Sequence, residues 1–372
     1  MSNTPDKRIV MTLDAGGTNF RFTAMRSGVA VTEIIALPSN GDNLERCLAN
    51  IVEGFSCVKA KCPAPPAAIS FAFPGPADYP RGIIGDLGNL PCFRGGTPLG
   101  PILEDKFGIP TFINNDGDLF VYGEAIAGFL PHINGLLEKA GSPKRYRNLF
   151  GVTLGTGFGA GIVRDGQLFG GDNICAGEVW LLRNKLFPET NAEEGASIRA
   201  VRRVYAAKAG IPLAESPEPK LIFDIGNGQA PGNRAAAREA FRQLGEVVGD
   251  AMAQSLTLLD SLAVIGGGIS GAWPLFLPAI VDEMNSTYQK PGGGTFRRLA
   301  QFAYNLEDSA QLDAFLKGDK REVTVPGSGR RIAYDPLPRI GVGLSKLGTS
   351  EAVTIGAYAF ALRQLDASGA NL

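Results

Sequence analysis

Cysteine and histidine are scarce in this chain of 372 residues, which has five cysteines and a single histidine, His132. The cysteines form no C-x-x-C pair, the spacing that many structural zinc sites use. We therefore expect neither a structural zinc nor a disulfide framework. The five thiols are typical of small side chains that are buried or lie at the surface.

An excess of charge of one sign is also missing, because 36 lysines and arginines stand against 37 aspartates and glutamates. The formal net charge of −1 gives no electrostatic reason to expect a polyanion such as nucleic acid as a partner.

Long apolar runs are missing as well. Glycine, proline or charged residues interrupt every apolar stretch well short of the roughly 20 residues that a membrane-spanning helix needs. The first residues, MSNTPDKR, lack the apolar segment of a secretory signal peptide. These absences predict a cytoplasmic protein with no membrane partner.

Glycine, in contrast, is abundant: the chain has 49 glycines, and they are clustered. The clusters lie at residues 15–17, 85–100, 151–171, 266–271 and 292–294. Clustered glycine indicates loops in which the backbone approaches another group closely, where a Cβ atom would clash.

Strand and helix patterns alternate along the chain in two similar series. The first predicts strands at 8–15, 20–28 and 30–37, a helix at 43–60, a strand at 65–76, a helix at 97–108 capped by Thr97, a strand at 110–116 and a helix at 117–130. The second predicts a glycine-rich hairpin at 148–170, helices at 193–209 and 233–259, a strand at 261–270 and a closing helix at 352–365. The repetition predicts two related α/β halves that face a cleft.

The segment LDAGGTNFRF, residues 13–22, places Asp14 and a glycine turn at the end of the first strand. Ligands of open α/β sheets bind beyond the carboxyl ends of strands, and residues 155–161 occupy the corresponding place in the second half. Two such turns could wrap an extended anion such as a triphosphate with their backbone N–H groups. Asp14 would then need a cation between itself and the phosphates, and Mg²⁺ held through water is the natural candidate.

Two other nucleotide-binding motifs agree less well with the sequence. The chain has no G-x-x-x-x-G-K-[ST] segment, which excludes a P-loop NTPase. Gly266, Gly268 and Gly271 match the dinucleotide pattern G-x-G-x-x-G, but no second strand ending in an acid follows Ile280 at the required spacing. A tight hairpin that binds nothing remains an alternative for the AGGT turn.

The segment INNDGDLFVYGEA places Asp116 at the end of a short strand and immediately before a helix. Asp116 is either a helix cap or a general base that accepts the proton of an attacking hydroxyl, and Asn115 could orient that hydroxyl. Asp118 competes for the role of base, although its position in the first helical turn favours a dipole role. Glu178 and Glu193 suit paired hydrogen bonds to sugar hydroxyls, with helix capping as the alternative for Glu193 and Glu194.

A set of segments then carries a resemblance: LDAGGTNFRF, FPGP, GNLP, NNDGDLFVYGEA, LGTGFGAGIVRDGQLFGG, AGE, VIGGGIS and IGAYAFAL. In their order and spacing they resemble bacterial sugar kinases of the ROK family, including bacterial glucokinases. The resemblance implies an α/β, two-domain fold of the actin-like ATPase or hexokinase type, with ATP and sugar in the interdomain cleft. We expect an N-terminal domain of residues 1–115, completed by a helix at about 360–372, and a larger domain of residues 116–359.

The resemblance also implies roles for single residues. The first phosphate loop matches Asp14, Gly16, Gly17, Thr18 and Asn19, with Asp14 steering Mg²⁺. The second phosphate loop matches Gly155, Thr156 and Gly157, and the turn beside adenosine matches Gly266, Gly267 and Gly268. Asp116 matches the catalytic base, and Asn89, Asn115, Asp116, Glu178 and Glu193 match sugar contacts. The implied protein is an ATP-dependent carbohydrate kinase, and a homodimer.

The chain departs from the family pattern at Leu181, where the family has a histidine three residues after the acid of the GE motif. The cysteine cluster that follows this histidine and binds zinc in the family is absent here. Segments 131–148, with a basic end, and about 287–335 are apparent insertions, for which solvated loops are the default expectation.

Two other functions stay open. A catalytically silent sugar-binding protein would agree with Leu181, and a kinase for an N-acylated amino sugar or fructose would agree with the same motifs. Repressors of the family place a helix-turn-helix ahead of the first phosphate loop, and only about eight residues precede the first predicted strand here.

Overall fold

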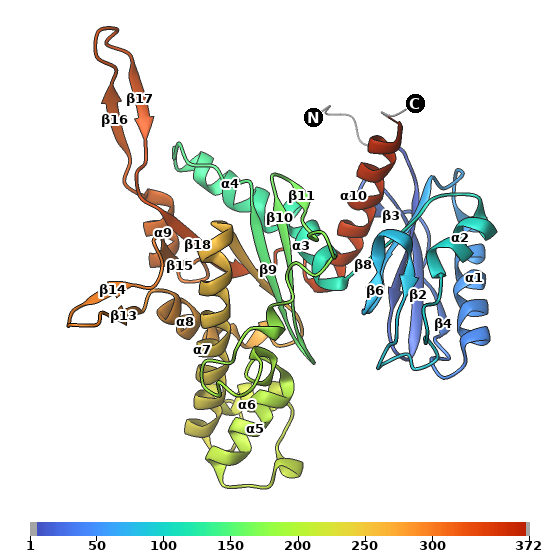
Figure 1. Ribbon diagram of the computed structural model, residues 1–372, viewed down its shortest axis with the longest axis horizontal. Coiled ribbons are helices and arrows are strands. Elements are labelled where there is room, and N and C mark those ends of the chain that lie inside the picture. The colour runs from blue at the N-terminus through green and yellow to red at the C-terminus, as the bar shows by residue number, and fades with distance from the viewer. Residues whose placement is uncertain (1–5, 370–372) are drawn as a thin grey trace. The chain divides into compact units, whose positions relative to one another are not determined.

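The computed structural model describes residues 6–369, which divide into two compact units (Figure 1). Unit 1 contains the described residues up to Ala127, the short segment Gly170–Ile174 and the residues from Leu347 onward. Unit 2 contains Gly128–Phe169 and Cys175–Lys346. None of the helices in the described range combines the length and the apolar character that a membrane crossing requires.

The sheet of unit 1 has the strand order β3-β2-β1-β5-β8, and β4 also pairs with β2. Its strands are β1 (Val10–Ala15), β2 (Asn19–Arg26), β3 (Val29–Ala30), β4 (Ile35–Pro38), β5 (Ala68–Ala72) and β8 (Thr111–Asn114). The hairpin β1–β2 is antiparallel, whereas β1, β5 and β8 run parallel. Consequently the carboxyl ends of the three parallel strands meet at one edge of the sheet. A short pair, β6 (Ala77–Asp78) and β7 (Ile83–Ile84), follows β5.

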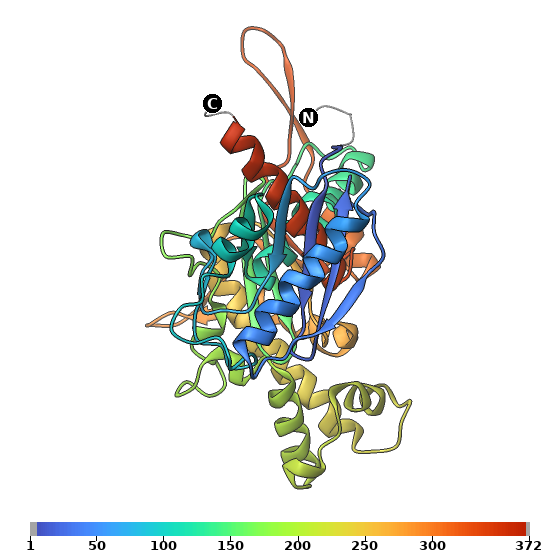
Figure 2. The same cartoon turned by 90° about the vertical axis from the view of Figure 1, so that its right-hand side faces the viewer.

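Helices cover both faces of this sheet (Figures 1 and 2). On one face, α1 (Leu44–Lys61) and α2 (Leu99–Phe107) pack on an aromatic core in which the rings of Phe55 and Phe22 are 5.1 Å apart. On the other face, α3 (Asp116–Ile126) and α10 (Thr349–Gly369) contact each other and the sheet.

The crossing of α3 and α10 is unusually close because glycine lies on both helices. A Cβ atom on Gly123 of α3 would lie 2.0 Å from the carbonyl oxygen of Ala352, and one on Gly356 of α10 would lie 2.0 Å from that of Leu119. The crossing therefore fixes α3, with Asp116 at its first turn, against the N-terminal half of α10. With this contact, α3 and the described part of α10 fall in unit 1, whereas the expected boundary lies after residue 115 and the expected C-terminal helix begins at about 360.

Unit 2 repeats the same sheet design, with the strand order β11-β10-β9-β12-β18-β15. Its strands are β9 (Leu149–Leu154), β10 (Phe158–Arg164), β11 (Gln167–Leu168), β12 (Leu262–Gly266), β15 (Phe302–Asn305) and β18 (Arg339–Leu344). Strands β9 and β10 again form an antiparallel hairpin. Strand β9 then runs parallel to β12, and β18 and β15 continue the parallel part of the sheet. The two α/β halves expected from the sequence are therefore present.

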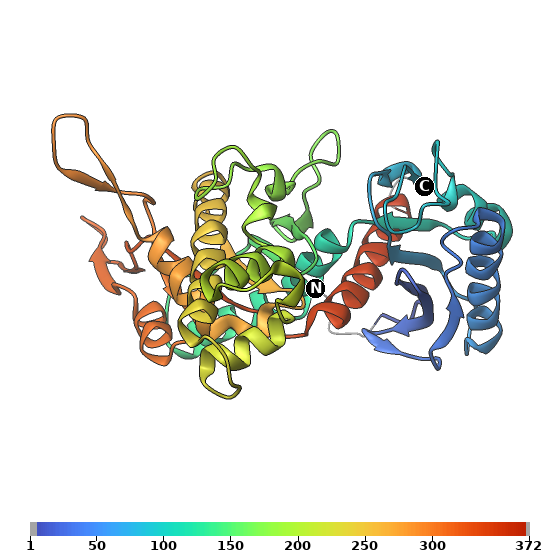
Figure 3. The ribbon, with the colours of Figure 1, turned by 90° about the horizontal axis from the view of Figure 1, so that it is seen from below.

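The helices of unit 2 are α4 (Phe129–Lys139), α5 (Ile198–Ala209), α6 (Pro219–Asn227), α7 (Arg234–Leu259), α8 (Trp273–Met284) and α9 (Ser309–Lys317). The long helix α7 packs against α5, α6 and α8 over the sheet and supplies much of the core (Figure 3). Phe129, at the start of α4, lies against Gly343 of β18.

Two β-hairpins project from unit 2, β13 (Thr287–Gln289) with β14 (Thr295–Arg297), and β16 (Arg321–Thr324) with β17 (Arg331–Tyr334) (Figures 1 and 3). Segment 287–335 is thus more than a solvated loop, because it also contains β15 and α9. Segment 131–148 is mostly the helix α4 and its connection to β9.

Three local predictions are wrong. Thr97 does not cap α2, because its backbone pairs with Ile84 in a short bridge and Pro98 occupies the cap position without a side-chain hydrogen bond. The helix predicted at 117–130 is interrupted at Ala127 and Gly128, so that α3 and α4 are separate. The helix predicted from residue 193 begins at Ile198, after a 3₁₀ turn at Ala192–Glu194.

Candidate active site

The first glycine turn joins β1 to β2 at the carboxyl end of β1. Asp14 lies opposite Arg21 in the ladder, and its carboxylate is exposed and receives no hydrogen bond from any residue in the 6–369 range. A Cβ atom on Gly16 would lie 2.8 Å from the carbonyl oxygen of Asn19, so the turn itself requires this glycine. A Cβ atom on Gly17 would meet nothing closer than 4.0 Å, so the fold leaves that position open.

Ser39, a residue that sequence reasoning missed, holds this turn in place. It is buried and follows β4, which pairs with β2. Its backbone N–H donates to the carbonyl oxygen of Thr18 at 3.0 Å, and its hydroxyl donates to that of Gly17 at 2.5 Å. Because the two segments are about twenty residues apart, only the strand pairing of β2 with β4 could have indicated this contact.

A cavity of about 390 Å³ in unit 1 brings four of the predicted site residues together. They are Asp14, Asn89, Asn115 and Asp116. The N-terminal half of α10 contributes further polar groups, among them Ser350 and Thr354, which the sequence analysis did not single out. Residues from β1, from the loop before α2, from the start of α3 and from α10 thus share one hollow.

Asp116 lies where β8 ends and α3 begins. Asn115 is the cap of α3, and its side-chain oxygen accepts from the Gly117 N–H at 2.8 Å. The Oδ1 atom of Asp116 accepts from the same N–H at 2.8 Å, which leaves Oδ2 without a donor among the described residues. The side chain of Asp116 is exposed to the cavity, whereas Asp118 is 7% exposed and does not line it. The helix N-terminus favours a negative charge here.

In unit 2 the second glycine turn and the triple glycine lie next to each other. Gly155, Thr156 and Gly157 connect β9 to β10, and Gly266 ends β12, which is the parallel neighbour of β9. The Ile269 N–H donates to the carbonyl oxygen of Leu154 at 3.0 Å, which ties the two turns together.

The triple glycine contains one position that the fold requires and one that it does not. Gly267 has φ +91°, and a Cβ atom there would lie 2.3 Å from the carbonyl oxygen of Leu154. A Cβ atom on Gly268 would meet nothing within 4 Å. Gly268 therefore resembles Gly17 of unit 1: at both positions a Cβ atom would fit, so the packing of the turn does not explain the glycine.

The two predicted sugar acids of unit 2 already have partners in the protein. Glu193 accepts from the Phe158 N–H at 3.0 Å and pairs with the Arg199 guanidinium at 2.7 Å. Glu178 accepts from the indole N–H of Trp180. The structure thus assigns Glu193 a contact to the second glycine turn, and neither Trp180 nor Arg199 was singled out from the sequence.

Arg199 also fixes the neighbouring carboxylate. Hydrogen bonds from Arg199 and then Arg203 hold the pKa of Glu194 below its ordinary value. This acid is accordingly committed to ion pairs on α5.

Leu181 ends the 3₁₀ turn Val179–Leu181 and is 59% exposed. No three His, Cys, Asp or Glu side chains within residues 6–369 are grouped as ligands for a metal ion.

Comparison with known proteins shows the family of this chain. The model of the ROK family matches residues 10–303 of the chain. A glucokinase of known crystal structure from Parabacteroides distasonis is 55% identical, with a TM-score of 0.90, over 98% of this chain and 99% of that one.

More distant relatives agree with this match. An N-acetyl-D-glucosamine kinase from Vibrio cholerae is 27% identical over 273 residues, which cover 69% of this chain and 83% of the relative. A ROK family glucokinase from Streptomyces griseus, solved in complex with glucose and AMPPNP, is 18% identical with a TM-score of 0.59, over 94% of this chain and 98% of that one. At this identity the second likeness shows the fold alone.

The match to the family model over more than half of the chain, and to a glucokinase over nearly all of it, confirms the expected family, the expected fold and the expected class of enzyme. The two mixed α/β sheets are the structural counterpart of that match. The chain belongs to the ROK family and is a carbohydrate kinase of the glucokinase type.

Proposed function

We propose that this protein transfers the γ-phosphoryl group of ATP to a hydroxyl group of glucose, or of a closely similar hexose. The observation that carries the proposal is the position of Asp116, exposed at the first turn of α3 on the wall of the unit 1 cavity. The 55% identity to a glucokinase over nearly the whole chain supports the choice of glucose.

Asp116 is the proposed general base. One of its oxygens is held by the Gly117 N–H, so the carboxylate has a fixed direction, and the other oxygen can accept the proton of the sugar hydroxyl. Asn115 and Asn89 line the same cavity and are the proposed partners of neighbouring hydroxyls. Asp118 is a weaker candidate, because its side chain is buried and does not line the cavity.

Glu178 and Glu193 are the proposed sugar contacts of unit 2. A carboxylate has about four acceptor sites, so the bonds to Trp180, Phe158 and Arg199 leave capacity for sugar hydroxyls. In this proposal the protein contacts orient each acid before the sugar arrives.

ATP is the proposed phosphate donor. We assign its phosphates to residues 14–19 and 155–157 and its adenosine to residues 266–268. The open positions Gly17 and Gly268 support this assignment, since a missing Cβ atom that the fold does not need leaves room for a ligand beside the backbone. Phosphoryl transfer asks little covalent chemistry of the protein, so the main tasks of these residues are positioning and charge neutralisation.

Asp14 fits the Mg²⁺ that accompanies ATP. Mg²⁺ binds through one or two carboxylates together with water and phosphate oxygens, and the Asp14 carboxylate is exposed and accepts no hydrogen bond from residues 6–369. When bound, the ion would neutralise charge on the phosphates. A homodimer, implied by the family resemblance, remains part of the proposal.

A second candidate substrate is an N-acylated amino sugar. Leu181 favours it, because an exposed apolar side chain three residues after Glu178 offers a surface for an acyl methyl group. The similarity to an N-acetyl-D-glucosamine kinase agrees with this alternative.

The test is coupled ADP release from ATP with glucose, fructose, N-acetylglucosamine and N-acetylmannosamine in parallel. We expect the highest kcat/KM with glucose. A preference for an acetylated sugar would favour the second candidate. If none of the four sugars supports ATP turnover, a silent sugar-binding protein is favoured and the proposal is overturned.

A further inference from the structure

The segment between Glu178 and Glu193 folds into a compact loop. The 3₁₀ turns Val179–Leu181 and Ala192–Glu194 at its two ends pack against each other. Arg183 and Asn191 form a β-bridge, and the Ala192 N–H donates to the carbonyl oxygen of Leu182 at 2.7 Å. Residues 182–192 thus connect the two turns at which the proposed sugar acids Glu178 and Glu193 lie.

Asn184 closes this loop from inside. Its side chain is fully buried, and its Oδ1 atom accepts from the Leu186 N–H at 2.9 Å and from the Phe187 N–H at 3.2 Å. Its own N–H donates to the carbonyl oxygen of Thr190 at 3.0 Å. The conformation of the loop is therefore set locally, although these bonds do not attach it to the rest of unit 2.

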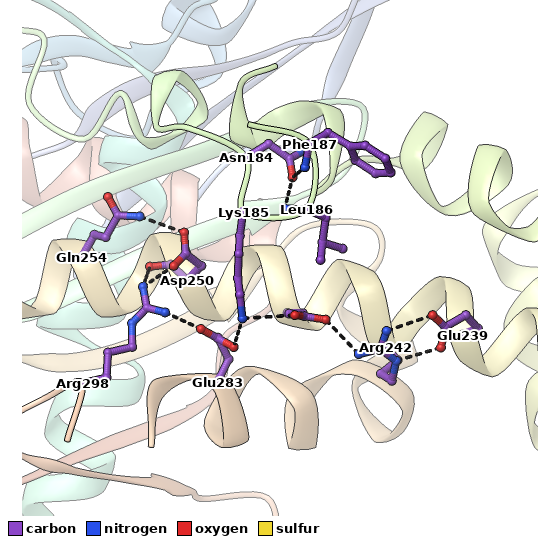
Figure 4. Close-up of polar contacts among 11 residues, drawn as sticks. Asn184, Lys185, Leu186, Phe187, Glu239, Arg242, Asp250, Gln254, Glu283 and Arg298 are labelled. Carbon is purple, nitrogen blue, oxygen red and sulfur yellow. Dashed lines mark hydrogen bonds and ion pairs between the residues drawn. The ribbon is translucent and has the colours of Figure 1, made fainter. Parts of the chain in front are cut away.

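Lys185 adds an ionic attachment to the packing of Leu182 and Leu186 against the core of unit 2 (Figure 4). Its ammonium group pairs with Glu246 of α7 at 3.1 Å and with Glu283 of α8. Lys185, which directly follows Asn184, is thereby tied to α7 and α8, and both helices contribute side chains to the core of unit 2.

The far end of this attachment is rigid. The two carboxylate oxygens of Glu283 are divided between Lys185 and Arg298, and Arg298 also pairs with Asp250 of α7. The side chains of Glu283 and Arg298 are 8% and 5% exposed. A hydrogen bond from Gln254 to Asp250 at 2.8 Å completes the buried end (Figure 4).

We propose that Lys185 is a positioning residue for sugar binding, which fixes the loop that carries Glu178 and Glu193 onto α7 and α8. The inference rests on the proposed function, because it concerns the same acids. It adds a residue that touches neither substrate and acts through the loop.

Three observations favour positioning over a general role in stability. Lys185 is one-third exposed and lies on the loop, outside the hydrophobic core of unit 2. Glu283 keeps Arg298 as a partner when Lys185 is replaced, so no buried charge is left unpaired. In addition, the loop has its own internal bonds at Asn184 and packs on the core through Leu182 and Leu186, so its conformation does not rest on Lys185 alone.

The ion pair between Lys185 and Glu246 stays charged near neutral pH. Burial lowers the pKa of Lys185, but the hydrogen bonds to Glu283 and Glu246 outweigh burial and leave it raised. Burial raises the pKa of Glu246, but the bonds from Lys185 and Arg242 leave it lowered. Both partners are therefore ionised near neutral pH.

The test compares Lys185→Met with Lys185→Arg and with Lys220→Met. Lys220 pairs with Asp224 at 2.6 Å on the surface of α6 and is a matched lysine outside the loop. Lys185→Met is expected to raise the KM for the sugar about tenfold to a hundredfold, as misplaced binding groups do, with the KM for ATP unchanged. Lys185→Arg is expected to restore most of the sugar KM, and Lys220→Met to change neither constant.

Equal increases in both KM values, or no increase in either, would overturn the inference. If Lys185→Met keeps the Tm of the unmodified protein while its KM for the sugar increases, the effect is on positioning and not on stability. Glu246→Gln, which removes one partner of Lys185 and leaves Glu283 in place, should give a smaller increase in the sugar KM.

Hydrogen exchange tests the inference without any substrate. Amides of residues 182–192 are expected to exchange faster in Lys185→Met than in the unmodified protein and in Lys220→Met. If exchange rises but no sugar is phosphorylated by the unmodified protein, the proposed function fails while the attachment stands. If exchange is unchanged, the attachment fails whatever the activity.

Discussion

The two units hold their site acids in different ways. In unit 1, Asp14 and Asp116 face a cavity, and the only hydrogen bond to either carboxylate from residues 6–369 is the one from the Gly117 N–H to Asp116. In unit 2, Glu178 and Glu193 are engaged by Trp180, by the Phe158 N–H and by Arg199. Replacing an acid of unit 1 should therefore affect activity alone. Replacing an acid of unit 2 should affect both activity and the stability of the fold.

Asp116→Asn gives the largest expected effect. The amide keeps the shape of the side chain and can still accept from the Gly117 N–H, but it cannot take up a proton. We expect kcat to fall by about 10² to 10⁴, the usual contribution of a general base. Coupled ADP release measures kcat, and calorimetry with glucose measures sugar binding, which should stay within a few fold.

The control for this experiment is Asp105→Asn, an exposed carboxylate on α2 that does not line the cavity. It should leave both measurements unchanged. Normal turnover in Asp116→Asn would remove Asp116 as the base and shift attention to Asp118.

The two glycines of the turn after β12 separate a demand of the fold from a demand of the ligand. Gly267→Ala places a methyl group against the Leu154 carbonyl and strains a backbone with positive φ, so we expect a loss of at least about 1–2 kcal/mol from the strain alone. Gly268→Ala meets no neighbour and should not lower stability. Urea denaturation measures both.

The kinetics of Gly268→Ala then test the ligand. If the proposed adenosine contact is correct, this stable variant should raise the KM for ATP and leave the KM for the sugar unchanged. An unchanged KM for ATP would show that no ligand approaches this position closely.

Glu193→Ala tests the opening comparison directly. It removes the acceptor of the Phe158 N–H and one partner of Arg199, so we expect a loss of about 1.5–3 kcal/mol, the usual contribution of hydrogen bonds to a charged group. Asp116→Asn should cost no stability. Equal stability of the two variants, measured by thermal unfolding, would contradict the difference between the units.

These residues also show what the sequence could predict. The glycine turns at 15–17 and 266–268 and the acid at Asp116 were predicted because each lies at the end of an apolar strand pattern, which is local information. The repeated sheet followed from the same patterns. The break at Ala127 and Gly128 was missed, because an apolar helical pattern continues through it from α3 into α4.

Contacts between distant segments could not be predicted in this way. Ser39 reaches the first glycine turn only because β4 pairs with β2, and Arg298 reaches Glu283 only because β14 lies near the end of α8. Thr97 has the composition of a helix cap, but pairing with Ile84 takes its backbone into a β-bridge. In each case a tertiary contact decides which of several local options a residue adopts.

Acid gives the smallest expected effect, and it should act on unit 2. The Arg242 hydrogen bond is the main cause that lowers the pKa of Glu239 to about 2, from an ordinary value of 4.5. A carboxylate with a lowered pKa stabilises the folded state above its unfolded pKa and loses that contribution as the pH falls through the folded value. Stability should therefore decline between about pH 4.5 and pH 2. Urea denaturation at pH 6 and pH 3 should show a smaller decline for Glu239→Gln than for the unmodified protein, while Glu215→Gln, an exposed acid of unit 2, should match the unmodified protein. A decline of the same size in Glu239→Gln would mean that acid acts elsewhere, for instance on Asp6 of unit 1, whose pKa is lowered chiefly by its hydrogen bond from Arg8.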